Sequence, residues 1–376
     1  MPTTTPGIKI EAVRALGARV ELVGEAYDEC EAWARETAMK EGRTFIPPFD
    51  DPRVIQGQGS VGVEILRQVS TASFGELDAI FVPVGGGGLI AGIAAYVKQL
   101  RPDIKVIGVE PIGANAMARS LERGERMTLD VVDKFADGVA VKAVGLETFE
   151  LCRALVDGIV VVRNSEICAA VKDIFTATRS IVEPSGALAL AGLKAYAEHY
   201  GVRGKTLCAI VSGANMNFDR LRVIADLANV GKKQEAVLAT SIPEVPGSFL
   251  EFCMQLGDTD ITEFRYRCNR DPVDRANVMY SITVRDSQEL QTIKENLASA
   301  GLDTVDCTDD ELVVMHLKAL AGGLGCLLQK ERIFSFEFPE RPGALLKFLE
   351  LICPRFNITL FHYRNEGTWG VERVFD

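Results

Sequence analysis

Histidine is scarce in this chain, and cysteine never occurs as a closely spaced pair. The 376 residues include three histidines, His199, His316 and His362, which lie far apart in the sequence. None of the nine cysteines belongs to a Cys-x-x-Cys motif. Zinc sites need several of these side chains together, and a Ser-His-Asp triad needs a histidine beside its nucleophile. The composition therefore argues against both kinds of site and predicts that no metal is bound.

Excess positive charge and long apolar runs are also missing. The formal net charge of −11 disfavours nucleic acid and anionic membrane surfaces as partners. No apolar run in the sequence approaches the roughly 18 residues that a membrane-spanning helix needs. The cysteines are odd in number, and most lie among apolar neighbours. This usage is typical of buried free thiols in a reducing compartment.

Glycine, by contrast, is concentrated at one point. Residues 79–84 (AIFVPV) form an apolar, strand-like run that leads into Gly85, Gly86, Gly87 and Gly88, and a helical pattern follows. Four glycines in a row cost backbone entropy, and close approach of a ligand is the physical reason for them. Without Cβ atoms, several backbone N–H groups can converge on one anion at the start of a helix. The sequence thus predicts a phosphate cradle, with a plain flexible turn as the alternative.

The glycines alone do not choose among the ligands that carry phosphate. The dinucleotide fingerprint is matched only loosely, with Glu110 as the candidate acid for a ribose. A nucleoside triphosphate is disfavoured because no Gly-Lys-Ser/Thr follows the glycines. Pyridoxal 5′-phosphate is the third possibility.

Residues 1–230 alternate short apolar runs with helical patterns. We expect strands at 19–23, 79–84, 106–109, 159–162 and 206–211, and helices at 27–41, 61–68, 90–100, 165–178 and 186–199. Gln58 and Ser60 then fall in the turn before the second helix. This alternation predicts an α/β domain with a mainly parallel sheet, whose ligands bind at the carboxyl ends of the strands. The glycines lie at one such end, and the small residues 212–215 (SGAN) lie at another.

Residues 230–376 contain one module used twice. Residues 242–253 (IPEVPGSFLEFC) match residues 338–349 (FPERPGALLKFL) at six of twelve positions. Residues 261–267 (ITEFRYR) match residues 358–364 (ITLFHYR) at five of seven. In the first copy a strand, a helix and another strand follow, at 277–284, 287–300 and 304–307. The pattern predicts a β-α-β-β-α-β unit of the ferredoxin-like plan, and only the first half of a second.

In this order, the motifs resemble those of the biosynthetic threonine ammonia-lyase (threonine dehydratase) family. They are residues 47–52 (PPFDDP), 55–59 (IQGQG), 82–89 (VPVGGGGL), 137–142 (DGVAVK), 183–191 (EPSGALALA) and 212–215 (SGAN). The repeat is similar to the tandem ACT-like regulatory modules of the same family. The resemblance implies an α/β catalytic domain of fold-type II (tryptophan synthase β-like), followed by ferredoxin-like α+β modules. It places the catalytic domain at 1–230, the first module at 231–310, a connector at 311–330 and the second module at 331–376.

The resemblance also implies the cofactor and its ligands. Pyridoxal 5′-phosphate would be held by Gly85, Gly86, Gly87 and Gly88 and by the amide of Leu89. Ser212 would hydrogen-bond the pyridine nitrogen; its structural alternative is a helix N-cap. Glu183 would lie close to the cofactor; its alternative is a carboxylate that complements a helix dipole. Lys142 matches a position of the family that does not form the Schiff base.

By the same resemblance, the substrate would be L-threonine, converted to 2-oxobutanoate and ammonia at the entry to isoleucine synthesis. Isoleucine and valine would be the effectors, with Pro246-Gly247 and Pro342-Gly343 as the turns near which they bind. The intact family implies a homotetramer. Localisation would be cytoplasmic, or mitochondrial or plastidic with a transit peptide upstream.

One family element is missing from this sequence. The Schiff-base lysine of the family lies in a Ser-Phe-Lys-x-Arg-Gly-Ala segment, which does not occur here. No residue of this chain is therefore assigned as catalytic, and we expect a chain truncated at both ends, with an incomplete second module. The alternative function is a non-catalytic regulatory or ligand-binding relic of the same family.

Overall fold

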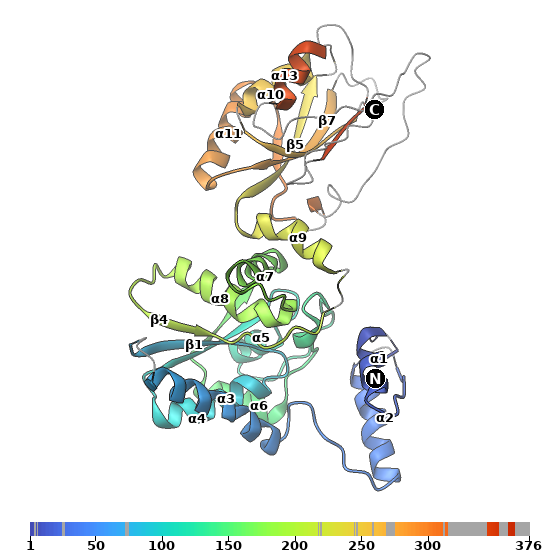
Figure 1. Cartoon of the computed structure of the whole chain (residues 1–376), viewed down its shortest axis with the longest axis vertical. Helices are drawn as coiled ribbons and strands as arrows, with labels where there is room; N and C mark the ends of the chain where they lie inside the picture. The colour runs from blue at the N-terminus through green and yellow to red at the C-terminus, as the bar shows by residue number, and fades with distance from the viewer. Residues whose placement is uncertain are drawn as a thin grey trace. The chain divides into compact units, whose positions relative to one another are not determined.

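The computed structural model divides the chain into two compact units, Met1–Arg222 and Val223–Asp376, each with its own sheet (Figure 1). The residues that the structure describes are 1–3, 5, 7–24, 27–71, 75–216, 218, 220–243, 245, 247–257, 259–267, 275–310, 313–314, 344–352 and 360–364. Pro246, the Pro342-Gly343 turn and nearly all of the expected connector lie outside these ranges.

Four parallel strands form the sheet of the first unit. They are β1 (Leu77–Pro83), β2 (Lys105–Pro111), β3 (Gly158–Val162) and β4 (Thr206–Ala209), in the order β3-β2-β1-β4. Strand β1 is apolar and buried from Ala79 onward because both faces of the sheet are covered. This arrangement confirms the predicted parallel α/β sheet.

Helices cover the two faces of this sheet. Figure 1 shows α3 (Pro52–Thr71), α4 (Gly88–Leu100) and α6 (Leu146–Leu155) on one face. On the other face lie α7 (Asn164–Thr178) and α8 (Pro184–His199). The predicted helices at 27–41, 90–100, 165–178 and 186–199 are found within a few residues of their expected bounds, the first as α2 (Tyr27–Lys40).

Two local predictions are wrong. Residues 19–23 form no strand, and their backbone instead contacts the first residues, where Val23 donates its N–H to the Met1 carbonyl. The helix expected from residue 61 begins at Pro52, so Gln58 and Ser60 lie inside α3 rather than in a turn. Four helices were not predicted: α6, α1 (Gly7–Ala15), α5 (Ala116–Arg123) and α9 (Arg220–Gly231).

Gly59 of α3 is a packing feature and not a break in the helix. A Cβ on Gly92 of α4 would lie 2.3 Å from the Ile55 carbonyl oxygen and 2.7 Å from the Gly59 backbone nitrogen. A Cβ on Gly59 would in turn lie 3.2 Å from the Gly92 carbonyl oxygen. The two helices therefore approach each other backbone to backbone, which larger residues would prevent.

Glu110, at the end of β2, is almost fully buried and accepts two hydrogen bonds from the start of α5. Its Oε1 lies 2.9 Å from the Met117 nitrogen, and its Oε2 lies 2.7 Å from the Ala118 nitrogen. The carboxylate thus serves as a cap for a helix whose own N-cap residue makes no side-chain bond. Burial raises the pKa of Glu110 from 4.5 to about 7, and the two backbone hydrogen bonds oppose this shift.

The first module of the second unit has the predicted β-α-β-β-α-β plan. Its elements are β5 (Glu235–Pro243), α10 (Ser248–Leu256), β6 (Ile261–Arg267), β7 (Arg275–Thr283), α11 (Ser287–Ser299) and β8 (Thr304–Asp306). The strands are antiparallel in the order β8-β5-β7-β6, as in ferredoxin-like folds.

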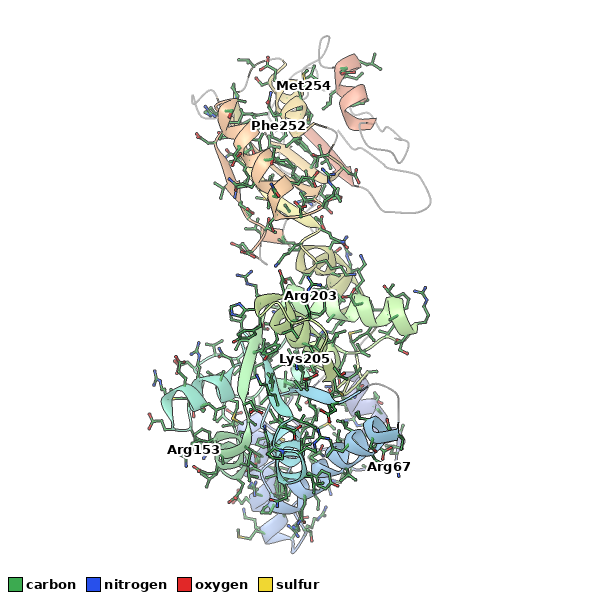
Figure 2. All side chains as sticks on the ribbon, turned by 90° about the vertical axis from the view of Figure 1, so that its left-hand side faces the viewer. Arg67, Arg153, Arg203, Lys205, Phe252 and Met254 are labelled. Carbon is green, nitrogen blue, oxygen red and sulfur yellow. The ribbon has the colours of Figure 1, made fainter. Side chains whose placement is uncertain are left out.

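The core of this module is aromatic, and α10 turns one face toward it and the other toward solvent. Phe252 is fully buried and meets the Tyr280 ring edge-on at 5.0 Å between centroids, whereas Met254, two residues further along α10, is exposed (Figure 2). The Tyr280 hydroxyl lies 3.0 Å from the Thr240 hydroxyl, so this buried polar group is paired.

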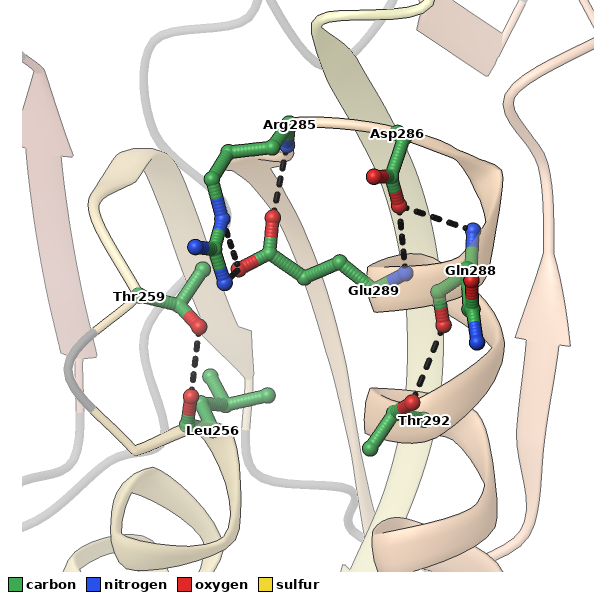
Figure 3. A network of polar contacts seen from close by, with 7 residues as sticks. All are labelled: Leu256, Thr259, Arg285, Asp286, Gln288, Glu289 and Thr292. Carbon is green, nitrogen blue, oxygen red and sulfur yellow. Dashed lines mark hydrogen bonds and ion pairs between the residues drawn. The ribbon is translucent and has the colours of Figure 1, made fainter.

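The start of α11 is fixed by its own side chains (Figure 3). Asp286 is the N-cap, and its Oδ1 accepts hydrogen bonds from the Gln288 and Glu289 nitrogens at 3.0 and 2.9 Å. Glu289 also pairs with Arg285 at 2.8 Å. These contacts account for the helix that the sequence predicts from residue 287.

The second copy of the repeat extends the same sheet. Its strand β9 (Leu360–Arg364) pairs antiparallel with β6, the equivalent strand of the first copy, and its helix α13 (Ala344–Ile352) contacts α10. The register places Arg265 opposite His362, which is its own counterpart in the repeat. On either side, Phe264 pairs with position 363 and Tyr266 pairs with position 361. In the repeat, position 363 is the counterpart of 266 and position 361 is the counterpart of 264, so the two pairs are equivalent. The two strands are therefore related by a local two-fold axis through the pair 265/362.

We predict that Gly92→Ala destabilises the first unit by about 1–3 kcal/mol, because the new methyl group has no space between α3 and α4. The matched control is Gly57→Ala in α3, where a Cβ would meet nothing within 4 Å. Alanine there should instead stabilise the helix, by up to about 1 kcal/mol. Urea unfolding followed by circular dichroism measures both; equal effects would contradict the close contact.

We predict that Glu110 makes the stability of the protein depend on pH between about 4.5 and 7. Because its pKa is higher in the folded chain, the protonated carboxyl stabilises the fold below this window, and that contribution is lost as the pH rises through it. Over the whole window the loss amounts to about 3 kcal/mol. Comparing the unfolding free energies of wild type and Glu110→Gln at several pH values tests this; parallel pH profiles would contradict it.

Candidate functional site

The tetraglycine loop, Gly85–Gly88, and the 212–215 turn follow neighbouring strands of the parallel sheet. The loop comes directly after β1, and Ser212 comes shortly after β4, which pairs with β1. Both segments therefore lie at the carboxyl edge of the sheet, where ligands bind in such folds. The structure brings together the two places that the sequence singled out.

The backbone of the tetraglycine loop presents a row of donors. In the part of the chain that the structure describes, the N–H groups from Gly85 to Leu89 have no hydrogen-bond acceptor. Gly86, Gly87 and Gly88 are buried. Gly87 is the N-cap of α4, with φ of 97°, and it has no side chain to satisfy the first turn. Unpaired amides at a helix start, with the positive end of the helix dipole, are suited to bind an anion.

The loop is also packed on several sides. A Cβ on Gly86 would lie 2.4 Å from Cγ of Phe49, and one on Gly87 would lie 2.7 Å from Cε of Met117. A Cβ on Gly85 would lie 3.0 Å from Cα of Val139. These contacts argue against the alternative of a plain flexible turn, because each glycine is needed for space, and Gly87 is also needed for its positive φ.

Ser212 is exposed and lies outside any helix. The next helix, α9, begins only at Arg220, so the N-cap alternative for Ser212 does not hold. Its hydroxyl is thus left available at the same edge as the tetraglycine loop.

Glu183 lies against the turn that contains Ser212. It is the N-cap of α8, and its backbone N–H donates to the Gly213 carbonyl at 3.1 Å. A Cβ on Gly213 would lie only 2.2 Å from Oε1 of Glu183, so the carboxylate is placed directly beside this glycine. The carboxylate makes no capping bond to α8. Burial, and then the charge of Asp137, raise the pKa of Glu183.

Two cations near Glu183 were not found by sequence reasoning. Lys9 pairs with Asp137 at 2.7 Å, and Arg220 lies 3.6 Å from the other oxygen of the same carboxylate. Both cations lower the pKa of Glu183 and so oppose the effect of Asp137. The sequence holds no signal for this cluster because its members are far apart along the chain: Lys9 and Asp137 are 128 residues apart, and Arg220 follows later still.

Two other candidates have structural roles or lie at the surface. Glu110 caps α5, which accounts for it without a ribose. Lys142 is exposed, and its carbonyl accepts the N–H of Leu129. Among the described residues, no group of His, Cys, Asp and Glu side chains could hold a metal ion. In that same part of the chain, no helix is long and apolar enough to cross a membrane.

Comparison with known protein families assigns both parts of the chain. Residues 1–213 match the pyridoxal-phosphate dependent enzyme family. Residues 226–317 and 324–375 match the C-terminal regulatory domain of threonine dehydratase.

Individual proteins agree with these family matches. The chain is 56% identical to the chloroplastic biosynthetic threonine dehydratase 1 of Solanum lycopersicum, over 98% of this chain and 60% of that protein. It is 51% identical to the biosynthetic L-threonine dehydratase of Burkholderia multivorans, over 98% of this chain and 72% of that protein. The structure of threonine deaminase isoform 2 from Solanum lycopersicum superposes with a TM-score of 0.58, at 52% identity, over 61% of this chain and 62% of that one.

The chain spans about 60% of the length of the plant relatives that it matches. Within the chain, the match to the pyridoxal-phosphate dependent enzyme family precedes the match to the regulatory domain. The chain belongs to the biosynthetic threonine dehydratase family of pyridoxal-phosphate-dependent enzymes.

Proposed function

We propose that this chain is part of a threonine ammonia-lyase, which converts L-threonine to 2-oxobutanoate and ammonia as the first step of isoleucine synthesis. The observation that carries the proposal is the row of backbone amides at the start of α4 that have no acceptor among the described residues, at the sheet edge where Ser212 follows the neighbouring strand β4. In this proposal residues 1–230 form the catalytic domain, 231–310 and 331–376 form the two regulatory modules, and 311–330 connect them.

The residues present fit the phosphate of pyridoxal 5′-phosphate. Gly85, Gly86, Gly87, Gly88 and the amide of Leu89 would bind it, since their donors are free and no Cβ obstructs the approach. When bound, the cofactor stabilises negative charge at the substrate Cα.

Ser212 and Glu183 would set the polarity around the ring of the cofactor. The Ser212 hydroxyl would hydrogen-bond the pyridine nitrogen without placing a full negative charge beside it. A neutral partner leaves this nitrogen less protonated than a carboxylate would, which favours loss of the β-hydroxyl. Glu183, whose pKa is raised, would hold a proton on its carboxyl at higher pH than an exposed glutamate.

The sequence itself supports a second candidate function. Residues 1–376 contain no Ser-Phe-Lys segment, and this lysine is the group expected to take the Cα proton. A chain without it would act as a regulatory or ligand-binding relic of the family, with isoleucine and valine as effectors of the repeated modules. In either case we propose assembly as a homotetramer. The localisation would be cytoplasmic, or mitochondrial or plastidic with a transit peptide; two plant relatives are named as chloroplastic, and other relatives are bacterial.

We predict that residues 1–376, joined to the N-terminal segment of the tomato relative, release 2-oxobutanoate from threonine. Isoleucine should inhibit this activity, and valine should relieve the inhibition. Residues 1–376 alone should be slower by at least ~10²–10⁴-fold, since a positioned base contributes about that much. Comparable rates for the two proteins would contradict the need for the lysine. An inactive chimaera that nevertheless folds would favour the relic.

We predict that Gly87→Asp abolishes binding of pyridoxal 5′-phosphate, because a negative charge and a Cβ are placed against the phosphate and against Met117. The matched control is Gly124→Asp, which adds the same charge at another glycine of positive φ, with nothing within 4 Å. Equilibrium dialysis gives both affinities. Unchanged binding by the Gly87 variant would show that the phosphate lies elsewhere.

A further inference from the structure

We propose that Asp50 is a positioning residue for the cofactor phosphate, although it does not touch the phosphate itself. It would act by joining the segment that covers the tetraglycine loop to the helix that holds this loop. The proposal rests on the proposed function of the loop and adds a residue that no motif of the loop contains.

Asp50 caps α6 from a distant part of the sequence. Its Oδ2 accepts the N–H of Leu146 at 2.8 Å, and its Oδ1 accepts those of Glu147 and Thr148 at 3.0 and 3.3 Å. The N-cap residue of α6 is Gly145, which has no side chain for this purpose. The first turn of α6 therefore depends on the Asp50 carboxylate for its acceptor, and the carboxylate also complements the helix dipole.

That same turn of α6 holds the tetraglycine loop. The Thr148 hydroxyl donates to the Gly86 carbonyl at 2.6 Å, and the Gly145 N–H donates to the same oxygen at 3.2 Å. In a trans peptide the carbonyl oxygen and the next N–H point in opposite directions. Holding the Gly86 carbonyl toward α6 therefore turns the N–H of Gly87 away from α6, where it is free to meet an anion.

The residue before Asp50 packs on the loop directly. A Cβ on Gly86 would lie 2.4 Å from Cγ of Phe49, and one on Gly88 would lie 3.0 Å from its Cβ. Phe49 and Asp50 thus form a clasp: the ring lies on the loop, and the carboxylate is bound to the helix that holds the loop. The fit is close, because a Cβ on Gly145 would lie 2.3 Å from Oδ1 of Asp50.

The neighbouring aspartate provides a matched control. Asp51 accepts the N–H of Arg53 at 2.8 Å and pairs with its guanidinium at 3.0 Å, so it serves the start of its own helix, α3. It makes no contact with α6 or the tetraglycine loop among the bonds of the described residues. Asp51→Ala therefore removes one negative charge and the hydrogen bond at the start of α3. It leaves the contacts of Phe49 and Asp50 with the loop and with α6 unchanged.

The test uses the full chain, with pyridoxal 5′-phosphate and inorganic phosphate as probes in equilibrium dialysis and phosphorus NMR. We expect Asp50→Ala to weaken binding of both probes by roughly tenfold or more, as is typical for residues that orient a ligand-binding group. Asp50→Asn, which keeps one acceptor oxygen, should recover part of the loss. Asp51→Ala should bind as wild type.

A second variant guards against misfolding of the first. Thr148→Val keeps the shape of a buried side chain but removes its hydrogen bond to Gly86, and it should weaken binding in the same way. Wild-type affinity in a folded Asp50→Ala or in Thr148→Val overturns the proposal, as does an equal loss in Asp51→Ala. If the wild-type chain binds neither probe, the phosphate cradle itself fails, and the proposed function fails with it.

Discussion

Backbone N–H groups at the start of a buried helix need an acceptor, and this need organises the first unit. From Gly85 to Leu89 the chain offers donors without providing acceptors from the residues that the structure describes. A buried amide without a partner costs free energy comparable to a lost hydrogen bond. The surrounding elements hold the loop in this state through Phe49, Val139, Met117 and Thr148. An incoming anion would meet donors that are already oriented, so little ordering would remain to be done on binding.

The neighbouring helices differ in how their first N–H groups find an acceptor. At α5 the cap is Glu110, and at α6 it is Asp50, each a carboxylate from another element. At α4 the position stays open, with glycine as the cap residue. Of these three helix starts on one sheet edge, two are closed by carboxyl groups of the protein itself. The third has no such carboxyl group, and in the proposed function it would accept the negative charge of a ligand.

Features made by neighbouring residues could be predicted from the sequence, whereas contacts between residues far apart in the sequence could not. The strands β1 to β4 and the tetraglycine loop are signalled by adjacent residues, and so were predicted. The cap on α6 could not be, because Asp50 and Leu146 are 96 residues apart. The start of α3 was misplaced because Gly57 and Gly59 are poor helix formers, whereas close packing on Gly92 accounts for Gly59 within the helix. Local propensity is a weak guide where tertiary contacts decide.

The two-fold relation between β6 and β9 places a special demand on one position. On such an axis a residue faces its own counterpart, so an exact duplicate of the first module would set arginine opposite arginine at 265 and 362. Like charges directly opposite on paired strands are destabilising. The second copy carries histidine there instead of a second arginine. The aromatic positions on either side can be the same in both copies, because each of them pairs with a different position. The residue on the axis pairs with its own counterpart, so a charged residue there cannot be kept in both copies without repulsion.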